Sequence, residues 1–249
     1  MLPREGGAIG TGIIIDNSSI TGKRTIHTQA VRAHGVRSRA GVEPRGQTIY
    51  NELRRRIVLN ELGPSTVLTE LALAAELASS QSSIREALLR LEGEGLVTRS
   101  GHQGTAVTDL DADAAEEILG LRRRIETRAA SAVVRRLSSG DMARLLGLME
   151  DMRQAARDDD LWAMVRADTD FHLGLFRIAG LHAMEPILAR CIMHTHRFRL
   201  WAPWHRRPLT QTAERHVPIL AALEARDAAA LRQELERHLD TIVEAKHAS

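Results

Sequence analysis

The chain has 249 residues, of which 43% are hydrophobic, and its 34 basic and 32 acidic residues leave a net charge of +2. This length is enough for two modest domains that each bury a core. Cys191 is the single cysteine, which excludes an intrachain disulfide. The apolar run at residues 12–15 is too short to span a bilayer and lacks the layout of a signal peptide. We therefore expect a cytoplasmic protein that makes no membrane contact.

The first 44 residues show no lasting hydrophobic period and mix Gly, Ser and Thr with scattered basic residues. This composition is typical of a segment that cannot bury a core of its own. We expect residues 1–44 to form a flexible basic N-terminal extension. Such an arm can reach DNA phosphates or a minor groove, although a dispensable extension or a start codon assigned too far upstream is the simpler interpretation.

The next 64 residues, 45–108, carry signals for three helices and a hairpin. Apolar residues share one face of a helix within residues 48–60, and Gly63 with Pro64 stops it. Thr69 is a candidate N-cap for a second short helix, and a third follows in the run QSSIREALLRLEGEG. The segment LVTRSGHQGTAVT then alternates around a central GHQG, which indicates a two-stranded wing. Two short helices with a tight turn and a wing predict a winged helix-turn-helix, a DNA-binding module.

The remainder of the chain, residues 109–249, is almost continuously helical by its 3.6-residue period. Each segment has one apolar face, so an antiparallel all-helical bundle is the expected packing. The fold class is therefore mainly α, a winged helix-turn-helix domain followed by a helical bundle. The expected helices span residues 112–137, 141–157, 160–179, 183–201, 210–225 and 227–246.

Four side chains in the bundle have the types and spacing of metal ligands. Asp168 and His172 lie one helical turn apart, so both leave the same helix face. His216 and His238 lie on consecutive helices joined by a tight turn, and antiparallel packing could point both inward. Imidazole and carboxylate suit zinc, nickel, cobalt, iron or manganese, and the lack of thiolates argues against a closed structural zinc site.

The first module resembles the winged helix-turn-helix of the GntR family of bacterial transcription regulators, over residues 48–108. The motifs that carry the resemblance are IREALLRLEGEGLV and the following GHQGTAV. The resemblance implies binding to double-stranded operator DNA, with the wing tip in the minor groove. The family usually has arginines where Leu71 and Gln81 stand, and Gln81 can instead pair with adenine, which implies an altered sequence preference. The implied DNA-contacting residues are Gln81, Ser82, Ser83, Arg85, His102 and Gly104.

The second half, over residues 112–246, is similar to the effector domain called FCD that occurs in the FadR subfamily of the same family. LRRRIETRAA is similar to its opening helix, and DTDFH and HVPILAALEARDAAALRQELERHL to its metal-binding segments. The resemblance implies a homodimer and a small carboxylate-type effector. It also implies one divalent metal, with zinc favoured and nickel, manganese or iron as alternatives. The implied metal ligands are Asp168, His172, His216 and His238.

An effector of this kind needs cationic partners beside the metal. Arg122, which begins an RxxxE pattern with Glu126, can supply a bidentate fork to an oxyanion. The run CIMHTHRFRL offers His194, His196, Arg197 and Arg199, which cannot all face one cavity because they alternate along a helix. We expect Arg122 and His196 to line the effector site.

These features predict a transcription regulator, not an enzyme, whose operator binding responds to a small organic acid bound at or near a metal. Three alternatives remain from the sequence. The chain could be a metabolite- and metal-binding module with degenerate DNA recognition, because Leu71 and Gln81 replace arginines. The metal could be purely structural. The site could also belong to a metal-dependent hydrolase, although no nucleophile or base is evident beside the ligands.

Overall fold

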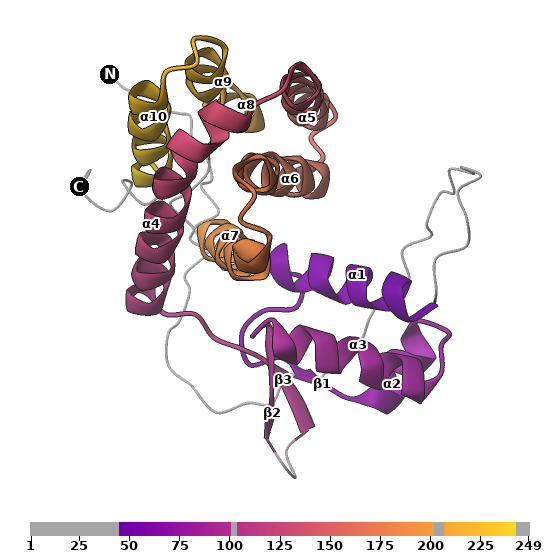
Figure 1. The fold of residues 1–249 in the computed structure, drawn as a ribbon. Helices are drawn as coiled ribbons and strands as arrows, with labels where there is room; N and C mark the ends of the chain where they lie inside the picture. Colours follow the sequence, from indigo (N-terminus) through magenta and orange to yellow (C-terminus); the bar gives the residue numbers. More distant parts are fainter. Residues whose placement is uncertain (1–44, 101–103, 202–206, 243–249) are drawn as a thin grey trace, which may run out of the picture. The chain divides into compact units, whose positions relative to one another are not determined.

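The computed structural model describes residues 45–100, 104–201 and 207–242. These residues form a helix-rich N-terminal half with a small sheet, followed by a half built from helices (Figure 1). The expected mainly α class is confirmed. The predicted N-terminal extension, the wing tip at residues 101–103 and the last residues of the predicted C-terminal helix lie outside the described residues.

The N-terminal half packs three helices on a three-stranded sheet. The apolar face of the first helix is buried as its period predicted, with Leu53, Ile57 and Val58 fully enclosed. Thr69 and Ser80 accept backbone N–H bonds as N-caps, which sets where the second and third helices begin. The elements are α1 (Arg45–Val58), β1 (Val67–Leu68), α2 (Glu70–Glu76), α3 (Gln81–Gly93), β2 (Val97–Ser100) and β3 (Gly104–Val107).

The sheet has one strand more than the predicted hairpin. Its order is β1-β3-β2 and both pairings are antiparallel, with Leu68 opposite Thr105 and Arg99 also opposite Thr105 from the other side. The strand β1 has two residues, of which Leu68 is buried and Val67 is 60% exposed. Two residues give no measurable alternation, so only the pairing with β3 in the folded chain reveals this strand.

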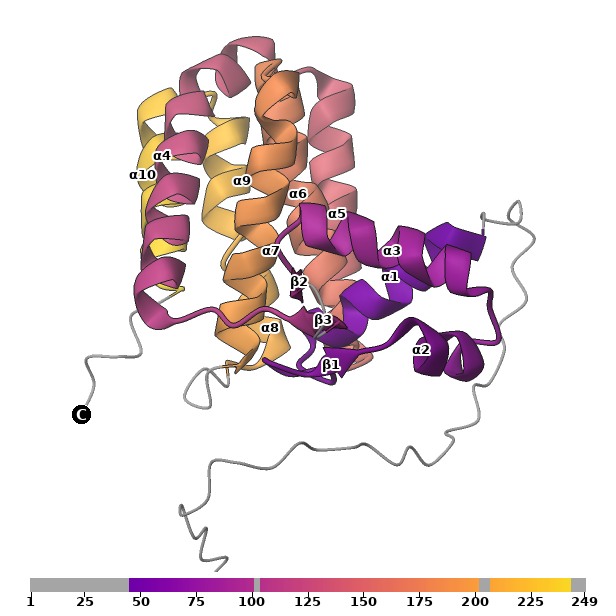
Figure 2. The same ribbon diagram turned by 90° about the horizontal axis from the view of Figure 1, so that it is seen from below.

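The second half consists of antiparallel helices, with α6 enclosed by its neighbours along most of its length (Figures 1 and 2). Asp111, Ser138, Asp160 and Asp227 each accept backbone N–H bonds at a helix start. None of the described helices is both long and apolar enough to cross a membrane. The helices are α4 (Ala112–Arg136), α5 (Ser139–Arg157), α6 (Leu161–Ala179), α7 (Glu185–Trp201), α8 (Leu209–Glu214), α9 (Val217–Glu224) and α10 (Ala228–Asp240), and a 3₁₀ turn η2 (His182–Met184) precedes α7.

The single helix expected over residues 210–225 is instead two helices, α8 and α9, that break at Arg215 and His216. The physical reason is Pro218, which lacks an N–H donor and is tolerated only in the first turn of a helix. A new helix therefore starts just before it, with His216 as the N-terminal flanking residue. This break matters because it orients the His216 side chain independently of the α8 axis.

The turn after α6 depends on Gly180, which has φ of +75° and ends the helix in the left-handed conformation. A Cβ atom at this position would overlap the guanidinium of Arg136, which donates a 2.6 Å hydrogen bond to the Ala179 carbonyl. We predict that Gly180→Ala lowers the free energy of unfolding by about 1–2 kcal/mol, measured by urea denaturation.

Gly147→Ala is the matched control, because Gly147 lies on the exposed side of α5 and a Cβ there meets no atom within 4 Å. It is expected to leave stability unchanged or to raise it by up to about 1 kcal/mol, since alanine is the better helix former. Equal effects of the two substitutions would contradict the role assigned to Gly180.

Candidate metal centre and DNA-contacting face

Four buried side chains from three helical elements meet at one point in the second half. Asp168 and His172 come from adjacent turns of α6, His216 from the start of α9 and His238 from α10. Each offers one ligand atom, and these atoms lie within 4.8 Å of one another. The four side chains belong to residues that are at most 6% exposed. The structure thus brings together all four residues that the sequence singled out as metal ligands.

The spacing of the ligand atoms suits a small cation. Asp168 Oδ1 lies 3.2 Å from His216 Nε2, and His172 Nε2 lies 3.2 Å from His238 Nε2. Ligands at about 2.0–2.2 Å from a tetrahedral or octahedral ion are separated by about 3.0–3.5 Å. His216 Nε2 makes no hydrogen bond among the described residues despite its burial. This buried nitrogen faces the Asp168 carboxylate within the cluster, which is where a metal ligand would have to point.

Two of the histidines are held in the tautomer that a metal needs. His172 Nδ1 lies 2.6 Å from Glu126 Oε2, and His216 Nδ1 lies 3.1 Å from the Ala213 carbonyl oxygen. Both partners are acceptors, so each Nδ1 carries the proton and donates it. The lone pair is then on Nε2, which faces the cluster in both residues. Carboxylate and carbonyl partners of this kind orient metal-binding histidines in many proteins.

The charge states of the cluster also favour ligation. Burial alone would raise the pKa of the Asp168 carboxyl, but the facing histidines, His196 first, hold it well below its usual range. Burial lowers the pKa of His238 well below its usual range, and the neighbouring His216, His172 and Arg215 lower it further. Asp168 is therefore ionised and His238 neutral near pH 7, which are the forms that bind a metal.

Arg122 and Glu126 form a buried ion pair beneath the cluster, one helical turn apart on α4. Arg122 Nε donates to Glu126 Oε1 at 2.5 Å, and the two residues are 1% and 4% exposed. Burial alone would raise the pKa of Glu126, but His172 and Arg122 together lower it to about 2. Arg122 Nη2 has no hydrogen-bond partner in the described part of the chain. This guanidinium therefore orients His172 through Glu126 and keeps a free donor.

A narrow cavity opens beside the cluster and contains both residues expected to bind the effector. Its volume is about 10 Å³, which is about the space of one water molecule. His196 lies there with Nε2 3.1 Å from Asp168 Oδ2, and Arg122 lines the same cavity. The sequence did not single out Arg215, which lines it from the α8–α9 break. No periodic pattern could have found Arg215, because its direction depends on that break.

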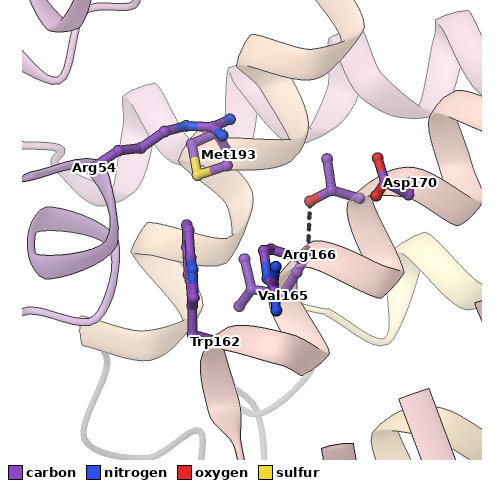
Figure 3. Close-up of a pocket in the computed structure, with 7 residues that line it drawn as sticks. Arg54, Trp162, Val165, Arg166, Asp170 and Met193 are labelled. Atoms are coloured by element: carbon purple, nitrogen blue, oxygen red, sulfur yellow. Dashed lines mark hydrogen bonds between the residues drawn. The ribbon is translucent and has the colours of Figure 1, made fainter. Parts of the chain in front are cut away.

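A larger cavity of about 180 Å³ lies between α1, α6 and α7, away from the four candidate ligands. Trp162, Arg166 and Asp170 from α6 surround it with Met193 and Arg54 (Figure 3). Thr169, which also lines it, donates its hydroxyl to the Val165 carbonyl at 2.7 Å. Asp168 and His238 line the narrow cavity, whereas none of the four candidate ligands lines the larger one.

The DNA-contacting residues predicted on α3 lie at its N-terminal end. Gln81 and Ser82 are exposed and Ser83 is half-buried. Both serine hydroxyls lie within hydrogen-bond distance of the Ser80 hydroxyl, at 2.8 and 2.9 Å. The backbone N–H groups and the dipole at such a helix start favour a phosphate. Leu71 on α2, in the same half, is 69% exposed.

Arg85 projects from the exposed side of α3 and forms an ion pair with Glu70 at the start of α2. Its Nη2 atom lies 2.6 Å from Glu70 Oε2, and its Nε atom donates to the same carboxylate. The pair is exposed, so solvent screens it and a stronger anion such as a phosphate can replace the carboxylate. Gly104 begins β3 with φ of +83°, as a wing turn requires, whereas His102 lies outside the described residues.

Helix α7 contacts both halves through different side chains. His196 and Arg199, three residues apart, line the narrow cavity. On another face, His194 Nε2 donates to the Glu94 carbonyl at the end of α3 at 2.9 Å, and the fully buried Arg197 donates to Thr108. The four residues of this run are therefore divided between two faces, as their alternation along the helix required.

An exposed recognition helix with a wing, joined to a helical bundle with a buried polar cluster, defines the class of two-part bacterial transcription regulators. The chain belongs to the GntR family: the model described as "Bacterial regulatory proteins, gntR family" matches residues 45–107, and the FCD domain model matches residues 117–241. It is a GntR-family transcription regulator with an FCD effector-binding domain, and the resemblance drawn from the sequence is confirmed.

Relatives of this chain are named as regulators and not as enzymes. The Nta operon transcriptional regulator of Aminobacter aminovorans is 29% identical over 185 residues, which cover 73% of this chain and 86% of the relative. The transcriptional repressor RspR of Escherichia coli K12 is 25% identical over 81% of this chain and 89% of its own length. The solved structure of E. coli McbR/YncC has a TM-score of 0.69 at 22% identity, covering 82% of this chain and 97% of that one, which supports the fold.

The buried Arg122–Glu126 pair yields a prediction about stability. Removing one partner leaves the other charge buried without compensation, so Glu126→Ala is expected to lower the free energy of unfolding by about 3–5 kcal/mol. The measurement is urea denaturation in the presence of EDTA, so that metal binding does not contribute.

The double variant Arg122→Met, Glu126→Leu should recover part of this loss, because it replaces both charges with apolar groups of similar volume but leaves the buried His172 Nδ1 without its acceptor. Glu150→Ala, at an exposed ion pair on α5, is the control and should have no measurable effect. A loss below about 1 kcal/mol for Glu126→Ala would show that the pair is not a structural requirement.

Proposed function

We propose that this regulator holds one divalent metal at Asp168, His172, His216 and His238. We further propose that a small organic acid bound at or beside this metal changes the affinity of the homodimer for operator DNA. The observation that carries the proposal is the convergence of four buried ligand atoms within 4.8 Å, with two histidines held in the metal-binding tautomer by acceptors behind them. A chance cluster of buried histidines has no reason to share this orientation.

The donor atoms favour a divalent metal of intermediate hardness. Three imidazole nitrogens and one carboxylate oxygen suit zinc best, and nickel, manganese or iron also accept them. When bound, the metal supplies a positive charge and open coordination positions for a carboxylate oxygen. Arg122 offers its free Nη2 donor from one side, and His196 offers its ring from another. These residues would orient the acid by hydrogen bonds rather than activate it.

DNA recognition is assigned to α3 and the wing. Gln81, Ser82, Ser83 and Arg85 would enter the major groove or contact its phosphates, and His102 with Gly104 would reach the minor groove. A two-fold dimer presents two such helices, so the operator would be a pseudo-palindrome. The exposed Gln81 supports a sequence preference that includes adenine.

Helix α7 supports a physical route between the two sites. It carries His196 beside the metal cluster and, two residues earlier, His194, whose ring donates to the carbonyl at the end of α3. A shift of α7 caused by an occupied cavity would therefore change the placement of the recognition helix. Linkage requires the coupling to be reciprocal, so operator DNA would change effector affinity by the same factor.

Metal content is the direct test of the ligand assignment. We predict one divalent ion per chain in the purified wild-type protein, measured by elemental analysis after dialysis. His216→Ala and His238→Ala should each reduce this content to below about a tenth, because three ligands bind far more weakly than four.

His182→Ala is the matched control, since His182 is exposed on the turn before α7, and it should keep the full metal content. Circular dichroism should show that all three variants remain folded. Metal absent from the folded wild-type protein, even after incubation with zinc, nickel or manganese, would refute the metal centre.

Operator binding tests the second half of the proposal. In vitro selection from randomised duplex DNA with the full chain should yield a pseudo-palindromic site. Arg85→Ala is then expected to weaken binding to that site about 5- to 150-fold in fluorescence anisotropy, as loss of a direct DNA contact does.

Arg232→Ala, at an exposed arginine of α10, is the control for charge alone and should change affinity less than twofold. Selection that enriches no sequence, together with weak binding of every duplex, would favour a binding module with degenerate DNA recognition.

A further inference from the structure

The larger cavity lies where the N-terminal half meets the second half. Arg54 lines it from α1, and Trp162 and Met193 line it from α6 and α7. Among the described residues, none of those predicted to bind metal or DNA lines this cavity. Ligand sites occur preferentially at boundaries between domains. Its volume of about 180 Å³ is below the roughly 300–1,000 Å³ of pockets for drug-sized ligands, so it fits a smaller molecule.

One part of the cavity wall is apolar and enclosed. Val165 and Met193 are at most 3% exposed, and the half-buried indole of Trp162 lines the same cavity (Figure 3). An indole ring and a thioether adapt to both aliphatic and aromatic groups. An apolar group of a ligand that replaces water against this apolar wall is therefore favourable.

The remaining wall carries charges of both signs. Arg166 and Asp170 are exposed and lie one turn apart on α6, a spacing at which opposite charges commonly pair. No hydrogen bond or ion pair joins either of them to the other or to any residue within 45–100, 104–201 or 207–242. Arg54 adds a second guanidinium, whose Nε lies 3.5 Å from Glu94 Oε2 without a hydrogen bond. Arg166 and Asp170 are thus both free to bind a charged ligand.

The hydroxyl of Thr169 favours a hydrogen-bond donor in the cavity. Its proton is donated to the Val165 carbonyl at 2.7 Å, so its oxygen can only accept further hydrogen bonds. The neighbouring carboxylate of Asp170 also only accepts. An ammonium group, which has three donors and no acceptor, matches these two oxygens.

We propose that this cavity binds a small zwitterion, an α-amino acid with an apolar side chain. Its carboxylate binds Arg166, with Arg54 beside it, and its ammonium binds Asp170 and the Thr169 oxygen. Its side chain lies against the apolar wall. A carboxylic acid without an amine would be repelled by Asp170, and an amine without a carboxylate would be repelled by the two arginines. An α-amino acid compensates the charges of both signs.

The position of the cavity gives such a ligand contacts with both halves of the molecule. Arg54 belongs to α1 of the DNA-binding half, whereas the other residues of the cavity belong to α6 and α7. The inference goes beyond the proposed function and does not depend on the metal centre. The ligand is neutral overall, unlike the acid proposed to bind there.

Titration calorimetry with the full chain tests this inference. The first probes are L-leucine, 4-methylpentanoate, which lacks the ammonium, and 3-methylbutylamine, which lacks the carboxylate. Leucine should bind at least about tenfold more tightly than either analogue, because each truncation leaves a charged group of the cavity without its partner. L-methionine and L-phenylalanine then test which apolar side chain fits best.

Two conservative variants assign the two charges of the ligand. Asp170→Asn should weaken leucine binding at least about tenfold and reduce its advantage over 4-methylpentanoate to less than about twofold. Arg166→Gln should likewise remove the advantage of leucine over 3-methylbutylamine. A merely structural role would not produce this reciprocal pattern. Glu117→Gln and Arg128→Gln are the matched controls, since they remove the same charges from exposed positions of α4, and they should keep the full leucine affinity.

Three results would overturn the inference. The first is no saturable binding of leucine, methionine or phenylalanine up to about 10 mM, which would mean that the cavity holds water only. The second is equal affinity for leucine and its two analogues. The third is a leucine affinity that survives both Asp170→Asn and Arg166→Gln. Metal content and operator binding are measured separately, so none of these results bears on the metal centre.

Discussion

The second half of the molecule depends on keeping charged groups buried without leaving them unpaired. Asp168, Glu126 and Arg122 are all at most 5% exposed, and each would be costly to bury alone. They are tolerable because they form one chain of contacts, from the Arg122 guanidinium through Glu126 to the His172 ring and on to the cluster. The same series of contacts fixes the His172 tautomer. The hydrogen bond to Glu126 that makes burial possible therefore also turns the Nε2 atom of His172 toward the cluster.

Helix α7 connects the buried cluster to the N-terminal half. Its residues serve two surfaces, one facing the cavity and one facing the end of α3 and residue Thr108. Arg197 is fully buried at the second surface, where it also stacks on Trp201 with its Cζ 3.9 Å from the ring centroid. These hydrogen bonds join α7 to the N-terminal half, so one helix contacts both the buried cluster and the end of α3.

Arginines in two different environments distinguish the two halves of the regulator. The chain as a whole is close to neutral, which says little about a nucleic-acid partner. The charge that matters is local: Arg85 on the exposed face of α3, held by Glu70, and the arginines that line the narrow cavity, of which Arg122 is enclosed. The first kind is solvated and exchangeable, as DNA binding requires. The second kind includes Arg122, which is 1% exposed and forms an ion pair with Glu126.

The sequence by itself determined the helices, the module order and the four clustered side chains, because these depend on short-range signals. Apolar periodicity, the cap at Thr69 and the one-turn spacing of Asp168 and His172 are local properties. Only the tertiary structure decided the third strand β1 and the orientation of His172 by Glu126 across 46 residues of sequence. These features depend on contacts between segments far apart in the chain, and no local pattern records which distant partner a side chain will meet.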